Sequence, residues 1–144
     1  MGSNLNSMKP GRVVIVTQGR QAGKKAIIVH SHDKGTNARA FPHALVAGVE
    51  RAPRRVTRKM GKKRLAKRST VKPFAKYVNF NHLLPTRYTV PDFDLSAVNA
   101  KAMEEPETKQ AAKKNLKSEL EKEYLGGSKG DRQNAGFFFK KLRF

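Results

Sequence analysis

The sequence predicts a mainly β fold with α additions, arranged as a small barrel that carries a C-terminal helix and an extended tail. Two β-branched runs, 12–17 and 26–30, flank a glycine-containing turn. Further short β-rich runs are separated by Gly and Pro, which in a chain of 144 residues favours a small barrel. Beyond residue 92, apolar residues recur every four positions, which indicates one long helix.

The first expected element is an antiparallel hairpin with a basic tip. Arg12–Thr17 is rich in β-branched residues and predicts a strand, and Ala26–His30 predicts the returning strand. The turn between them supplies Gly19 and Gly23, which adopt positive φ at little steric cost.

The next segment contains one clear strand and one ambiguous stretch. Ala44–Glu50 predicts a third strand, ended by Pro53, and residues 55–57 are expected to extend the sheet briefly. Residues 61–69 have helical propensity but few apolar anchors. They form either a short exposed helix or an extended basic loop.

Residues 71–82 and 83–90 are expected to be irregular strand and loop. Aromatic and polar residues interleave in the first segment, and Pro85 interrupts the second. The aromatic side chains either belong to the core or stack on unpaired RNA bases, and we expect at least two in the core. These residues are Phe74, Tyr77, Phe80 and Tyr88, of which Phe74 and Phe80 share one strand face.

The C-terminal part predicts a helix followed by a tail. Acids and a proline at 104–107 suit a first helical turn, and glycines at 126–127 end the helix near Leu125. The apolar stripe is Ala112, Leu116, Leu120 and Tyr124. The tail carries four phenylalanines, some of which must dock on the chain's own core, on another protein or on bases.

We therefore divide the chain into four parts. They are a flexible N-terminal extension (1–8), a barrel (9–91) with a basic insertion (51–87), a linker and helix (92–126), and a tail (127–144).

The charge distribution indicates a polyanionic partner. The chain has 31 Lys and Arg against 11 Asp and Glu, a net charge of +20. No acid lies between Glu50 and Asp92, whereas thirteen basic residues lie from Arg51 to Arg87. Because unscreened like charge repels itself, this window predicts binding to nucleic acid with a steep salt dependence. Apolar residues interleave with the charges, so the window belongs to the folded structure rather than to a tail.

Several other functions find no support. The absence of cysteine removes disulfides and thiolate metal sites, and no nucleophile–base arrangement is identifiable, so we expect no catalytic residue, metal, cofactor or small-molecule substrate. Residues 19–25 superficially resemble a P-loop but are one residue short, with Lys25 at the Ser/Thr position. His30–Asp33 is expected to be a polar loop, and His43 and His82 to be isolated. No apolar run is long enough for a bilayer, and we expect no membrane partner.

Residues 9–29 resemble the KOW motif, a strand–glycine loop–strand unit of SH3-like barrels; a generic basic hairpin is the alternative. More of the chain resembles one family, the eukaryotic-type large-subunit ribosomal proteins number twenty-seven. The similar stretches are MKPGRVVIV, GRQAGKKAIIV, HALVAGVERAPRRVT, MGKKRLAKRS, VKPFAKYVNFNHLLPTRYTV and FFFKKLRF. The most specific are Asn79–Tyr88 and Lys140–Phe144, while the first seven residues depart from the family.

This resemblance implies an SH3-like KOW barrel with a structural role in the large subunit of the cytosolic ribosome. The partners would be large-subunit ribosomal RNA and neighbouring ribosomal proteins, and the location cytoplasmic with nuclear and nucleolar transit for assembly. A basic cluster at 62–68 is compatible with a nuclear localisation signal. The alternatives are a KOW-type factor bound to DNA or polymerase, an accessory domain of an RNA-modifying enzyme and, more weakly, a protein at a membrane surface.

The expected RNA contacts are Lys and Arg side chains, because cations neutralise phosphates. The first group is Arg54, Arg55, Arg58, Lys59, Lys62, Lys63, Arg64, Lys67 and Arg68. The others are Lys9, Arg12, Arg20, Lys24, Lys25, Lys72, Lys76, Arg87, Lys140, Lys141 and Arg143.

Overall fold

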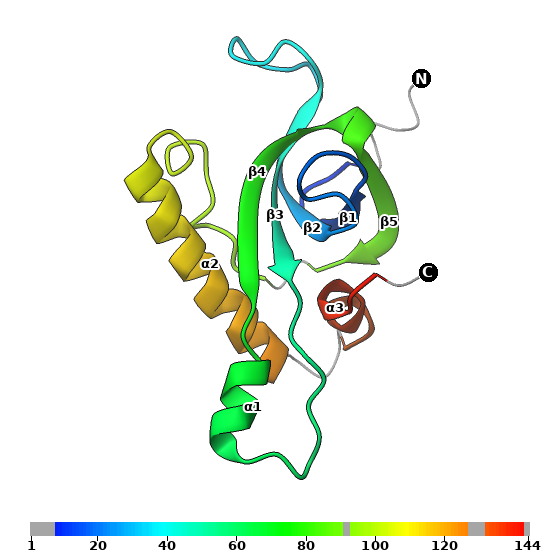
Figure 1. Ribbon diagram of the computed structural model, residues 1–144. Helices are drawn as coiled ribbons and strands as arrows, with labels where there is room; N and C mark the ends of the chain where they lie inside the picture. Colours follow the sequence, from blue (N-terminus) through cyan, green and yellow to red (C-terminus); the bar gives the residue numbers. More distant parts are fainter. Residues whose placement is uncertain (1–7, 91–92, 127–131, 143–144) are drawn as a thin grey trace.

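The fold is built on one five-stranded antiparallel sheet in the order β4-β3-β2-β1-β5 (Figure 1). The computed structural model describes residues 8–90, 93–126 and 132–142. The strands are β1 Arg12–Val16, β2 Lys25–His32, β3 His43–Arg51, β4 Lys72–Asn79 and β5 Leu83–Thr89. The mainly β prediction is confirmed, with helices added outside the curved sheet.

The predicted hairpin is present as β1 and β2. Val13 pairs with Ile27, and the intervening turn holds Gly19 at φ 95° and Gly23 at φ 81°. Strand β2 runs two residues beyond the expected end, because its last residues pair with the start of β3, His32 opposite His43. The expected polar loop at 30–33 therefore begins as strand.

Strands β4 and β5 correct the expectation of irregular structure. Strand β4 pairs along most of β3, from Lys72 opposite Arg51 to Asn79 opposite His43. Pro73 and Pro85 lie inside these strands. Both strands are at the edges of the sheet, where a residue without an N–H costs no ladder hydrogen bond on its outer side.

The connection between β3 and β4 also differs from expectation in one place. Residues 55–57 form no strand. The ambiguous stretch that follows is helix α1, Lys62–Arg68, none of whose residues is buried. A single 3-10 turn, η2 Phe80–His82, joins β4 to β5.

Alternating strand residues form two cores on the two faces of the sheet. One face places Val14, Ile28 and Val46 with Phe74 and the partly buried Phe80, which confirms that these two aromatics belong to the core. Met8, which was assigned to the N-terminal extension, packs here at 4% exposure, whereas residues 1–7 lie outside the described part of the chain. The other face places Val13, Ile27 and Leu45 against the C-terminal helices.

Helix α2, Pro106–Gly126, confirms the predicted helix. It runs alongside β4 (Figure 1) and buries Ala112, Leu116 and Leu120, while Tyr124 is partly buried. The carboxylate of Glu121 accepts a hydrogen bond from the backbone N–H of Val71 at 3.2 Å. This contact ties α2 to the start of β4.

The tail contains a helix, α3 Arg132–Phe139, where an extended chain was expected. Successive helical residues point about 100° apart, so neighbouring rings can share one core. Phe138 and Phe139 are buried, and Phe137 stacks on Tyr88 with ring centroids 4.2 Å apart. Three of the four tail phenylalanines thus dock on the chain's own core, while Phe144 lies outside the described residues.

Candidate nucleic-acid interface

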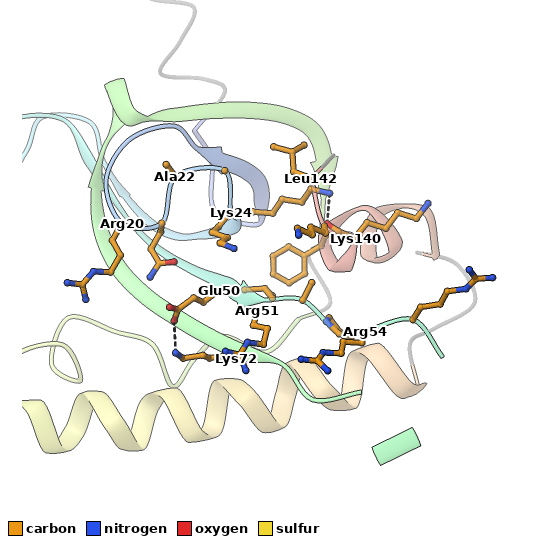
Figure 2. Close-up of a pocket in the computed structure, with 18 of the residues that line it drawn as sticks. Arg20, Ala22, Lys24, Glu50, Arg51, Arg54, Lys72, Lys140 and Leu142 are labelled. Carbon is orange, nitrogen blue, oxygen red and sulfur yellow. Dashed lines mark hydrogen bonds and ion pairs between the residues drawn. The ribbon is translucent and has the colours of Figure 1, made fainter. Parts of the chain in front are cut away.

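A cleft of about 690 Å³ lies where the hairpin turn, the end of β3, the start of β4 and the end of α3 meet (Figure 2). We call it the basic cleft. Among the described residues that line it, Glu50 is the single acid. Its cations are Arg20, Lys24, Lys25, Arg51, Arg54, Arg55, Arg68, Lys72, Lys140 and Lys141. Segments more than a hundred residues apart in sequence therefore combine into one strongly positive surface.

Little of this charge is compensated within the cleft. Lys72 Nζ lies 3.6 Å from Glu50 Oε2, and both side chains reach solvent, with 58% and 33% exposure (Figure 2). An ion pair this exposed contributes little stability, about 0–1 kcal/mol. The remaining cations raise the local positive potential, which attracts a polyanion.

Beside the cleft, residues 54–69 form a projection that we call the basic arm (Figure 1). Two hydrogen bonds close its base. The backbone N–H of Arg54 donates to Arg68 O at 2.8 Å, and Arg68 Nε donates to Arg55 O at 2.7 Å. Beyond this base, where Arg54 and Arg55 are also exposed, the arm's exposed cations are Arg58, Lys59, Lys62, Lys63, Arg64 and Lys67. A closed base with exposed cations beyond it presents a preformed basic surface.

Lys25 is placed differently from the sequence expectation. It is 5% exposed, and its Nζ donates to Phe137 O at 2.7 Å and to Lys140 O at 2.8 Å. The ammonium also lies 3.9 Å from the centroid of the Phe137 ring. Burial, followed by the charge of Lys140, lowers the pKa of Lys25. These contacts fasten Lys25 to the end of α3, which carries Lys140 and Lys141 at the cleft.

Replacing Lys25 with alanine is expected to loosen α3 selectively, because two carbonyl oxygens lose their donor. Losing these bonds costs about 1–3 kcal/mol of local stability. Hydrogen–deuterium exchange should therefore accelerate by about tenfold or more at residues 137–142. Lys24→Ala, next in the chain, is the control and should leave exchange there unchanged. Unchanged exchange in Lys25→Ala would rule out the fastening role.

The other predicted contacts are distributed over the surface. Lys9, Arg20 and Arg87 are exposed, and Lys24 is half-buried in the hairpin turn. Arg12 is half-buried and donates from Nη1 to Thr86 O at 2.7 Å, so part of its guanidinium serves the β1–β5 pair.

Two further cations lie apart from the basic cleft. Lys76 is exposed on β4, and its Nζ lies near the hairpin turn at Gly19. Arg87 lies outside the cleft, over the Tyr88 ring at 5.0 Å, and donates to the Tyr88 hydroxyl, which raises the pKa of Arg87. Arg143 lies outside the described residues.

Sequence reasoning missed two features. Arg51 lines the basic cleft; it lies in the basic window expected to meet phosphates but was not among the individually predicted contacts. His43 is not isolated, because its ring stacks on that of His32 at 4.8 Å. In the described part of the chain, no three metal-ligating side chains gather, and no helix is long and apolar enough to cross a membrane.

Comparison with known proteins identifies the family. The model of the Ribosomal L27e protein family matches residues 13–144. The large ribosomal subunit protein eL27 of Candida albicans is 50% identical over 139 residues, which cover 95% of this chain and 97% of that protein. Its counterpart of the same name in Caenorhabditis elegans is 45% identical over 138 residues, covering 95% and 97%. The chain therefore belongs to the Ribosomal L27e protein family.

Proposed function

We propose that this protein is a structural constituent of the large subunit of the cytosolic ribosome, where it binds and neutralises ribosomal RNA. The basic cleft is the observation that carries the proposal, because it gathers cations from four segments around one acid. Family membership supports a structural rather than an enzymatic role, and both relatives carry the name of a large-subunit protein.

The RNA contacts follow from which cations are accessible. The basic arm lies along phosphates, and the cleft holds a further stretch of backbone. Lysine and arginine contacts to phosphate give affinity and position without reading sequence. The proposed contacts are the predicted cations with Arg51 added and Lys25 removed, since its ammonium is used internally.

The same proposal includes the type of β fold, the other partners and the cellular location. The curved antiparallel sheet and the glycine hairpin support an SH3-like barrel with a KOW motif. In this proposal the chain divides into an N-terminal extension, a barrel, a linker with a helix, and a tail, with boundaries after residues 8, 91 and 126. Neighbouring ribosomal proteins are the other partners, and transit through the nucleolus precedes cytoplasmic function. The exposed basic residues of α1 support such transit.

Sedimentation of cell extract tests the proposal. The protein should co-sediment with large subunits, remain bound after a moderate salt wash, and be released by RNase. If it contacts about ten phosphates, log K for purified RNA should fall with log salt at a slope of about −7 to −9. Absence from large subunits contradicts the proposal, and release by DNase rather than RNase would favour the DNA- or polymerase-bound alternative.

A further inference from the structure

A second cleft, of about 560 Å³, lies at the opposite end of β2 and β3, and we call it the distal cleft. It is lined by His32, Arg39, His43, Lys76, Tyr77 and Lys109, among others. Lys25 at the basic cleft and His32 at the distal cleft are the first and last residues of β2. At about 3.4 Å per residue, the strand separates them by roughly 24 Å. The two clefts are therefore distinct sites.

The wall of the distal cleft is aromatic. His43 is 1% exposed, and its Nδ1–H donates to Phe41 O at 2.9 Å, which fixes the orientation of the ring. His32 is half-buried and stacks on His43 at 4.8 Å, and Tyr77 meets His43 edge-on at 5.6 Å. Burial, and then the neighbouring His43 and His30, lower the pKa of His32 despite an opposing effect of Asp33. The lowered pKa favours the neutral form of the His32 ring, which offers an uncharged π-face.

Cations surround this aromatic wall. The Arg39 guanidinium lies 4.3 Å from the Tyr77 ring centroid, and Lys109 lines the same cleft, which contains one acid among its described residues, Glu104. Lys76 also lines the cleft, but its Nζ lies beside Gly19 of the hairpin turn. Aromatic faces beside cations suit an unpaired nucleotide, because the base stacks on a ring while the phosphate meets the charges. A base-paired duplex leaves no base face free to stack on these rings.

We infer that the distal cleft binds one unpaired nucleotide of RNA, with its base on the His32–Tyr77 wall and its phosphate between Arg39 and Lys109. The protein then holds two RNA segments, one at each end of β2. The statement that the protein holds two RNA segments rests on the proposed function of the basic cleft. The nucleotide site itself is argued from the distal cleft alone.

Photocrosslinking of the full chain tests the inference. The probe is a single-stranded oligouridine RNA with one 4-thiouridine, and crosslinked peptides are mapped by mass spectrometry. We expect crosslinks at the peptides that hold His32 or Tyr77. The double variant His32→Leu/Tyr77→Leu should lose these crosslinks and weaken binding about five- to a hundredfold, measured at a salt concentration that suppresses phosphate contacts.

A matched variant and a folding check keep the result interpretable. Tyr124→Leu removes a ring from the α2–α3 contact and should leave the distal crosslinks unchanged. Circular dichroism verifies that each variant is folded, and if the double variant unfolds, Arg39→Gln replaces it with the same expected loss. Crosslinks confined to the basic cleft and arm overturn this inference alone, as do distal crosslinks that persist in the variant. Crosslinks at neither site contradict the proposed function as well.

Discussion

Replacing Phe138 with alanine is expected to lower the free energy of unfolding by about 3–5 kcal/mol. Its side chain is 1% exposed and is the largest of the fully buried ones in the described part of the chain. The ring packs edge-on against Phe93 at 5.8 Å and Phe139 at 5.2 Å, so truncation removes apolar burial and leaves a cavity. Urea denaturation followed by circular dichroism measures the change.

Phe41→Ala is the matched control for Phe138→Ala. Phe41 is 43% exposed in the loop before β3, and its removal should change the unfolding free energy much less. Similar losses in the two variants would show that α3 does not belong to the cooperative core.

Because Phe138 also lines the basic cleft, the Phe138→Ala variant should bind RNA more weakly.

The second large effect concerns the basic arm. Replacing Arg58, Lys59, Lys62 and Lys63 with glutamine should weaken RNA binding at least about a hundredfold near physiological salt. Each lost phosphate contact reduces the salt slope by about 0.7–0.9, so the slope should become shallower by about 3. These side chains are exposed, and stability should therefore change little. Fluorescence anisotropy over a salt series gives both quantities.

Four lysines of α2 provide a control with the same change in net charge. They are Lys113, Lys114, Lys117 and Lys122, placed among acids on a helix that packs beside β4. Their replacement with glutamine should reduce affinity far less than the arm variant. Equal losses would mean that net charge alone, rather than the arm, governs binding.

Local patterns predicted the elements whose signals are local. The β1–β2 hairpin and α2 carry their turn glycines and apolar stripe in sequence, and both were found as expected. Strands β4 and β5 were misjudged because a proline disfavours a central strand, and sequence does not show which strands lie at an edge. Helix α3 is stabilised mainly by contacts with residues distant in sequence, such as Tyr88 and Phe93.

The candidate site was predictable in charge but not in arrangement. The acid-free window indicated a polyanion without indicating that its cations meet the hairpin and the tail around one cleft. Lys25 shows the limit most clearly, because a lysine in a basic turn is expected to face solvent. Its carbonyl partners lie 112 and 115 positions along the chain, and no local pattern identifies them.

The prolines of β4 and β5 also bear on the protein before it meets RNA. An edge strand with free N–H and C=O groups can recruit a second copy and begin aggregation. Pro73 and Pro85 interrupt the two edges of this sheet, and Lys72 and Lys76 add exposed charge to one of them. Before RNA is bound, self-association is therefore opposed in two ways. The prolines remove N–H donors from the sheet edges, and chains of net charge +20 repel one another.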